Sequence, residues 1–124
     1  MKRCISAGQV GDFPYSPAVV AGGLCFVAGQ LGVGADGELA DGLAAQAEQA
    51  LRNLEAVLAE AGGTLADVVR TSVWLSSYDD FEAMNEVYRR FFPSEPPARI
   101  TLEVARLPLG AVVEVDAIAV LEAR

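Results

Sequence analysis

Apolar residues recur at helical spacing between residues 43 and 61. They lie three or four residues apart, as on one face of an amphipathic helix, at Leu43, Ala47, Leu51, Leu54, Leu58 and Ala61. Asp41 precedes them as a candidate N-cap, and Gly62 and Gly63 follow them as residues that end helices. This stretch is the clearest helix in the sequence.

A second apolar helical face follows near residue 80. Its aromatic and aliphatic members are Phe81, Met84, Tyr88, Phe91 and Phe92. Asp79 and Glu82 have the spacing of a capping box, with Asp in place of Ser or Thr. Pro93 cannot continue a helix, so we expect the helix to end before it.

Five further segments have the composition and alternation of β-strands, at residues 18–20, 24–28, 67–75, 99–107 and 111–121. Gly22 and Gly23 lie between the first two, which therefore form a hairpin in our interpretation. The order β-β-α-β-α-β-β packs most simply as one sheet with both helices on one face. We predict an α+β fold and a single domain over residues 1–124.

Alternation assigns side chains to faces of the predicted strands. In residues 67–75, one face carries Val69, Thr71, Val73 and Leu75, and the other carries Arg70, Ser72 and Trp74. Cys25 alternates with its apolar neighbours, so we expect a small buried core residue rather than a nucleophile.

The composition favours a compact domain that assembles with copies of itself. The chain has 124 residues, of which 52% are hydrophobic, and a mean hydropathy of +0.32. A chain this small and apolar leaves hydrophobic surface uncovered as a monomer, so we expect a homo-oligomer.

Charge and residue usage exclude several classes of function. Nine Lys and Arg against seventeen Asp and Glu give a net charge of −8, which opposes binding to nucleic acid or to anionic lipid. No apolar run has the length of a membrane span or of a signal-peptide core, so we expect a cytoplasmic protein. With two Cys and no His, we expect neither a zinc site nor a His-dependent nucleophile.

One arginine and one carboxylate stand in otherwise apolar, β-patterned sequence near the C-terminus. They are Arg99, in the strand predicted at residues 99–107, and Glu114, in the strand predicted at residues 111–121. An arginine fork can hold a carboxylate through two parallel hydrogen bonds. A glutamate in an apolar strand can act as a general base or proton shuttle near neutral pH.

A purely structural interpretation of these charges is also open. Arg99 could pair with Glu103 or with another acid, while Glu114 and Asp116 face solvent on an edge strand.

The spacing between the two charges bears on this choice. The connection near Leu109 is short, so the last two strands must run antiparallel. Arg99 lies ten residues before Leu109 and Glu114 five residues after it. At about 3.3 Å per residue the two are offset by roughly 16 Å, too far for both to contact one small metabolite. A shared site would therefore combine residues of different subunits.

Several motifs occur in order over nearly the whole chain. They are Phe13-Pro14-Tyr15-Ser16-Pro17-Ala18-Val19, Phe26-Val27-Ala28-Gly29-Gln30, Asp80-Phe81-Glu82-Ala83-Met84-Asn85-Glu86-Val87-Tyr88, Pro97-Ala98-Arg99, Val104-Ala105-Arg106-Leu107-Pro108 and Val113-Glu114-Val115-Asp116-Ala117-Ile118-Ala119. Each is weak alone, but together they resemble the Rid/YjgF family of reactive-intermediate deaminases.

The resemblance implies a chorismate-mutase-like fold, with a mixed sheet and two helices, and a homotrimer with ligand clefts between subunits. It implies hydrolysis of enamine and imine acids, such as 2-aminoacrylate and 2-iminopropionate, to 2-keto acids and ammonia. Neither a metal nor an organic cofactor would be needed. The expected partners are these small acids, and neither nucleic acid nor a membrane.

Residue roles follow from the same resemblance. Arg99 matches the arginine that holds the substrate carboxylate, and Glu114 matches the glutamate that positions the attacking water. Tyr15 matches a tyrosine that lines the cleft, Asn85 matches the family's asparagine, and Gly29 matches a glycine whose backbone approaches the ligand.

Three positions depart from the usual pattern of the family. Thr101 stands where members often have Cys or Ser, and we count it among the substrate-binding residues. Ala28 replaces a common serine, and Pro17 replaces a frequent glutamine. These differences bear on substrate preference more than on the chemistry.

Two other functions are compatible with the sequence. A binding or regulatory protein would hold keto acids in the same cleft without turnover. A role on RNA, described for members of the family, is opposed by the acidic charge and the missing His.

Overall fold

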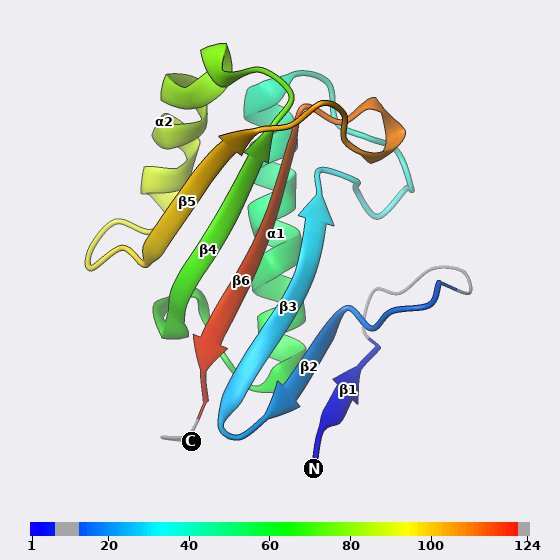
Figure 1. Ribbon diagram of the computed structural model, residues 1–124, viewed down its shortest axis with the longest axis vertical. Coiled ribbons are helices and arrows are strands. Elements are labelled where there is room, and N and C mark those ends of the chain that lie inside the picture. Colours follow the sequence, from blue (N-terminus) through cyan, green and yellow to red (C-terminus); the bar gives the residue numbers. More distant parts are fainter. Residues whose placement is uncertain (7–12, 122–124) are drawn as a thin grey trace.

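The chain forms a six-stranded sheet with both helices against the same face (Figure 1). This computed structural model describes residues 1–6 and 13–121. The strands are β1 (Arg3–Ile5), β2 (Ala18–Ala21), β3 (Leu24–Leu31), β4 (Val68–Leu75), β5 (Ala98–Glu103) and β6 (Val113–Val120). The helices are α1 (Leu43–Ala61) and α2 (Phe81–Phe91). The predicted α+β class and the shared helix face are confirmed.

The strands lie in the order β1-β2-β3-β6-β4-β5. β4 and β5 run parallel, because α2 carries the chain back between them, whereas the other neighbouring pairs are antiparallel. β6 therefore lies in the interior of the sheet, and β5 forms one edge. The predicted hairpin of β2 and β3 is confirmed, as is the antiparallel course of β5 and β6.

The strand boundaries differ from the sequence prediction in three places. β1 was not predicted, because its three residues are too few to show a period. β3 continues beyond residue 28 to Leu31. β5 ends at Glu103 and β6 begins only at Val113, because the chain between them turns through a 3-10 helix at Pro108–Gly110.

Alternation along β6 separates the two faces of the sheet. Its buried residues face the helices, and they are Val113, Val115, Ala117 and Ala119. The helices contribute fully buried side chains to the same core, among them Leu51, Leu54, Leu58 and Met84. Burial of each such side chain contributes about 1.5–3 kcal/mol to the free energy of unfolding, so this layer supplies much of the stability. The buried residues of the two helices confirm the predicted apolar helix faces.

A bulge in β4 corrects the predicted position of Val69. The pairing of β4 with β6 shifts between Val68 and Arg70, and a bulge of this kind adds one unpaired residue. Val68 is therefore buried, while Val69 is 47% exposed and does not share the buried face of Thr71.

The predicted N-terminal caps of both helices are also wrong, although α1 begins at Leu43 as expected. The residue before α1 is Gly42, and no side chain, that of Asp41 included, caps the start of this helix. α2 follows a 3-10 turn, Tyr78–Asp80, which Ser77 caps by accepting a hydrogen bond from the Asp79 N–H at 3.3 Å. The proposed capping box of Asp79 and Glu82 is absent from this described segment. The end of α1 is as predicted, with Gly62 in the left-handed region at φ 93°.

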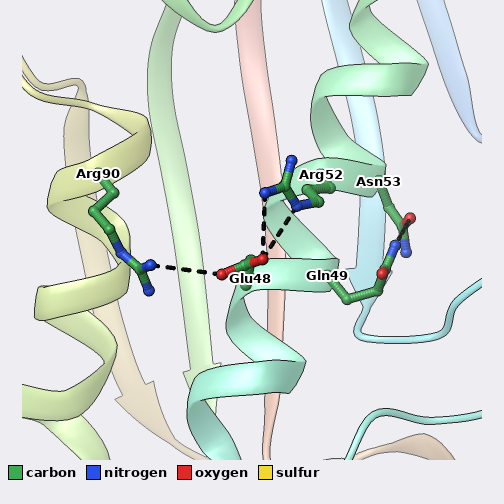
Figure 2. A network of polar contacts seen from close by, with 5 residues as sticks. All are labelled: Glu48, Gln49, Arg52, Asn53 and Arg90. Atoms are coloured by element: carbon green, nitrogen blue, oxygen red, sulfur yellow. Dashed lines mark hydrogen bonds and ion pairs between the residues drawn. The ribbon is translucent and has the colours of Figure 1, made fainter.

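Polar contacts on the outer side connect the two helices (Figure 2). Glu48 of α1 forms ion pairs with Arg52 at 3.3 Å and with Arg90 of α2 at 3.6 Å. These side chains are exposed, so each pair contributes at most about 1 kcal/mol. On the other side of α1, Asn53 Nδ2 donates a hydrogen bond to the Leu31 carbonyl at 3.0 Å, which holds the end of β3.

The face of the sheet away from the helices, here called the open face, carries apolar side chains. Phe26, Ile100 and Leu102 are 44%, 41% and 47% exposed. An apolar surface of this kind marks an interaction site. The predicted homo-oligomer thus has a candidate interface.

Candidate functional site

Arg99 lies on the edge strand β5 and is directed toward α2. It is in register with Thr71 of β4, whose buried hydroxyl is hydrogen-bonded to the Tyr88 hydroxyl at 2.7 Å. Residues in register share a face of the sheet, so Arg99 is on the helix face. Its guanidinium carbon lies 4.7 Å from the centroid of the Tyr88 ring and 5.5 Å from that of Phe81. These cation–π contacts hold the guanidinium against α2.

Two hydrogen bonds orient the guanidinium further. Arg99 Nε donates to Thr101 Oγ1 at 2.8 Å, and Nη2 donates to Asn85 Oδ1 at 2.6 Å. A guanidinium has five N–H donors, so three of them have no partner among the residues that the structure describes and are available to a ligand. Arg99 makes no ion pair within residues 1–6 and 13–121. Pairing with Glu103 is wrong, because these two described residues form no ion pair, and Glu103 Oε1 instead accepts the Tyr78 N–H at 2.8 Å.

Arg99 lines a hollow of about 470 Å³ between α2 and the loop that follows it. We call it the Arg99 hollow. From α2 it is lined by Asn85, Tyr88 and Arg89, and its apolar wall consists of Phe92, Pro93, Pro96 and Pro97. A concave surface with an apolar wall and a few fixed donors is typical of sites for small ligands.

Glu114 lies on the interior strand β6 and on the open face. It is in register with Trp74 of β4 and Leu31 of β3. With Gly29, Trp74 and Arg106 it lines a second hollow, of about 320 Å³, which we call the Glu114 hollow. The alternative that placed Glu114 on a solvent-facing edge strand is wrong, since β6 is flanked on both sides and Glu114 is half-buried.

The surroundings of Glu114 favour its protonated form. Burial raises the pKa of the Glu114 carboxyl above its usual value, and the charge of Asp116 raises this pKa further. Asp116 Oδ1 accepts a hydrogen bond from the Ser72 N–H at 2.9 Å. A carboxyl whose pKa is raised toward neutrality is suited to exchange protons with water or an amine.

Gly29 leaves the space that the Glu114 carboxyl occupies. The pairing of β3 with β6 shifts between Val27 and Gln30, which places Gly29 in a bulge. A Cβ at Gly29 would overlap Glu114 Oε2 and would lie 2.9 Å from the Glu114 carboxyl carbon. The described glycines with positive φ do not include Gly29, so the requirement is for space rather than for an unusual backbone conformation.

Arg99 and Glu114 lie on opposite faces of the same sheet. Arg99 is in register with Thr71 of β4, on the helix face, and Glu114 is in register with Trp74 of β4, on the open face. Arg99 and Glu114 are therefore offset by about 10 Å along the strand direction. The predicted offset of roughly 16 Å counted every residue between them as strand. It is too large because residues 104–112 are not a strand. Even so, the sheet itself separates the two side chains, so one chain cannot bring both to one small molecule.

Of the four remaining predicted site residues, three lie against Arg99 or Glu114. Asn85 and Thr101 contact Arg99, and Gly29 adjoins Glu114. Tyr15 lines neither hollow; it is 59% exposed and stacks on Phe13 with ring centroids 5.8 Å apart. Tyr15 precedes Pro17 by two positions, and the Pro17 carbonyl accepts the Ala28 N–H at 2.8 Å, so Tyr15 belongs to the segment beside the Gly29 bulge.

Sequence reasoning missed the aromatic support of Arg99 and the walls of the Glu114 hollow. Phe81 and Tyr88 were assigned to the core, yet their rings also hold the guanidinium. Phe81, Asn85 and Tyr88 are spaced i, i+4 and i+7, which places them on one helix face. That spacing was the available signal. Arg106 stood in one of the family motifs, but the convergence of Trp74 and Arg106 on Glu114 depends on the fold.

Other candidate chemistry is limited in the described residues. No group of three or more His, Cys, Asp or Glu side chains converges there as a metal site requires. Cys25 is buried, and burial raises the pKa of its thiol, which confirms its prediction as a core residue. Among the described helices, none combines the length and apolar character needed to cross a membrane.

Comparison with known proteins identifies the family. A family model described as Endoribonuclease L-PSP matches residues 9–121. Human 2-iminobutanoate/2-iminopropanoate deaminase is 39% identical over 126 residues, covering 97% of this chain and 90% of the human one.

Solved structures agree with this assignment. RidA from the Antarctic bacterium Psychrobacter is 40% identical with a TM-score of 0.86, covering 94% of both chains. Escherichia coli TdcF with bound serine is 34% identical with a TM-score of 0.85, covering 94% of this chain and 93% of that one. The fold is thus that of the Endoribonuclease L-PSP group. The chain belongs to the Rid/YjgF family within it, and the resemblance of its motifs is confirmed.

Proposed function

We propose that this protein hydrolyses reactive 2-imino acids and their enamine tautomers, such as 2-iminopropionate and 2-aminoacrylate, to 2-keto acids and ammonia. The observation that carries the proposal is the guanidinium of Arg99, which is held at two of its N–H groups and pairs with no acid among the described residues. The deaminase name of the human relative supports the same reaction.

Arg99 anchors the substrate carboxylate in this proposal. Its free N–H groups match the two oxygens of a carboxylate, and such charge-assisted pairs are stronger than neutral hydrogen bonds. Because Asn85, Thr101 and Tyr88 hold the guanidinium in place, little ordering entropy is lost when a ligand binds. The rest of the small acid then lies against the apolar wall of the hollow.

Glu114 carries the proton transfers. Water adds its oxygen to the C=N carbon while Glu114 takes one water proton and passes it to the imine nitrogen, which becomes the amine of a carbinolamine. Glu114 then takes the carbinol hydroxyl proton and passes it to the amine nitrogen. The C–N bond breaks as the keto group forms, and the nitrogen leaves as ammonia. Imine and water are consumed, and keto acid and ammonia are released. No redox step is involved.

The catalytic cleft combines two subunits. Since the sheet separates Arg99 from Glu114 within one chain, Glu114 must come from the open face of a neighbouring copy. Closed rings of identical subunits repeat such an interface, and the proposed assembly is a homotrimer. The exposed Ile100 and Leu102 of β5 lie beside Arg99 and would be covered in that interface.

The first experiment generates 2-iminopropionate in situ and follows its decay. We expect Arg99→Ala to lose substrate affinity and Glu114→Gln to lose turnover, each by about 10²-fold or more. Arg90→Ala and Glu60→Gln remove the same charges elsewhere on the helices and should retain wild-type rates. Decay unchanged by both site variants would overturn the assignment.

A second experiment tests the shared cleft. Arg99→Ala and Glu114→Gln chains are mixed by unfolding and refolding together. Random assembly gives about a quarter of the clefts an intact Arg99 from one chain and an intact Glu114 from the next. Activity should recover to roughly that fraction. If the mixture stays as inactive as its components, the cleft does not combine these two residues from different chains.

Binding without turnover is a second candidate function. The TdcF structure with bound serine shows that a relative holds a small amino acid. Thermal stabilisation by pyruvate without ammonia release from any imine would favour this role. Action on RNA, the activity in the family model's description, is opposed by the net charge of −8.

A further inference from the structure

The Arg99 hollow contains a second guanidinium that the proposed reaction does not use. Arg89 of α2 lines the hollow together with Arg99, and the lining includes no carboxylate. Arg89 makes no ion pair within residues 1–6 and 13–121, whereas its neighbour Arg90 pairs with Glu48 (Figure 2). Within the described part of the chain, Arg89 is thus a cation without an acidic partner at the wall of a hollow that can hold a small ligand.

The helix geometry directs Arg89 toward the anchor. Asn85, which accepts a hydrogen bond from Arg99 Nη2 at 2.6 Å, lies four residues before Arg89. At about 1.5 Å per residue, a rise of about 6 Å along α2 therefore separates Arg89 from the residue that contacts Arg99. Side chains on a helix lean toward its N-terminus, so Arg89 covers the turn that carries Asn85. A molecule held by Arg99 in this hollow would therefore meet Arg89, which lines the same space.

We propose that the Arg99 hollow selects acids with a second carboxylate, and that Arg89 binds this distal group. The substrate class is then the 2-imino dicarboxylates, of which 2-iminosuccinate and 2-iminoglutarate are the simplest. This inference rests on the proposed function for the reaction, but not for the binding. Hydrolysis would convert 2-iminosuccinate and water into oxaloacetate and ammonia by the proton transfers already described.

A doubly charged acid needs both Arg99 and Arg89 in order to bind to this acidic protein. The net charge of −8 repels a doubly charged ligand over distance, so a local pair of cations must outweigh it. Arginine also provides donors in a planar fork, which suits a carboxylate better than a lysine does. Single carboxylate substrates use only Arg99 and should not depend on Arg89.

Binding of stable keto acids tests the inference without requiring turnover. 2-Oxoglutarate and 2-oxopentanoate have the same chain length and differ in the second carboxylate. We expect wild-type protein to bind 2-oxoglutarate about tenfold more tightly in calorimetry, the factor given by one charge-assisted hydrogen-bonded contact. Arg89→Gln should abolish this preference and leave the affinity for 2-oxopentanoate unchanged.

Arg90→Gln is the matched control, because it removes an equal charge from the next helix position outside the hollow. It should keep the preference. Equal affinities for both acids in the wild type, or a preference that survives Arg89→Gln, would overturn the inference.

Imine decay separates this inference from the proposed function. Arg89→Gln should slow hydrolysis of 2-iminoglutarate about tenfold relative to wild type, through KM, and leave 2-iminopropionate unaffected. Turnover of both imines with no role for Arg89 would sink the inference alone. Selective binding of 2-oxoglutarate without any imine hydrolysis would sink the proposed reaction alone.

Discussion

Gly29→Ala is the most direct test of how the structure positions Glu114. The added Cβ would overlap Glu114 Oε2 and would lie 2.9 Å from Cδ and 3.3 Å from Cγ of that side chain. The three heavy atoms nearest to the new methyl group all belong to this one side chain rather than to backbone. We therefore expect Glu114 to move and the strand pairing of β3 to remain.

The expected change in stability is small. At a φ that alanine can adopt, replacing glycine stabilises a protein by about 0.4–1 kcal/mol, because the unfolded chain loses freedom. Forcing Glu114 off its preferred rotamer costs about 0.5–1.5 kcal/mol. The two effects oppose each other, so the free energy of unfolding should change by less than about 1 kcal/mol.

Activity should respond much more strongly. A displacement of about 1 Å in a reacting group can cost about 10²-fold in rate. We expect kcat for 2-iminopropionate to fall by roughly 10–100-fold, with KM nearly unchanged because Arg99 is untouched. Imine decay gives both constants, and urea unfolding gives the stability.

Gly22→Ala serves as the control. Gly22 has φ 60°, and a Cβ there meets nothing within 4 Å. Alanine in this left-handed conformation costs about 1 kcal/mol, so this variant should lose stability and keep its kcat. The two glycine substitutions would then separate stability from activity.

Combining Gly29→Ala with Glu114→Gln checks that the effect passes through Glu114. The double variant should be no slower than Glu114→Gln alone, because both changes remove the same interaction. Wild-type kcat in Gly29→Ala, or a further loss in the double variant, would refute the reasoning.

Two further predictions concern pH and assembly. The raised pKa of Glu114 means that stability is greatest below its unfolded value of 4.5 and falls as pH rises through the folded value. Glu114→Gln should thus raise Tm at pH 7 but not at pH 4; an equal gain at both would contradict this. Leu102→Glu on the open face should give monomers in sedimentation and lose at least about tenfold in activity, unlike Ala56→Glu on the exposed side of α1. An active monomer would contradict the shared cleft.

Local sequence determined most of the secondary structure. The periods of α1, α2 and the longer strands are set by side chains within one element, so each can be recognised without its neighbours. The motifs around Arg99 and Glu114 placed both residues on strands, where the structure has them. The helix caps and the bulge at Val69 were missed, because they depend on the exact hydrogen bonds of the folded chain and on strand pairing rather than on periodicity.

Only the tertiary structure decided which face each catalytic candidate occupies. On β5 the apolar Ile100 and Leu102 are exposed on the open face, while Arg99 and Thr101 face α2, the reverse of what a buried-apolar rule predicts. The alternation along a strand is local, but its phase relative to the helices is set by pairing with β4. The contacts of Arg99 with Tyr88 and of Glu114 with Gly29 likewise join residues far apart in sequence, which meet only once the sheet has formed.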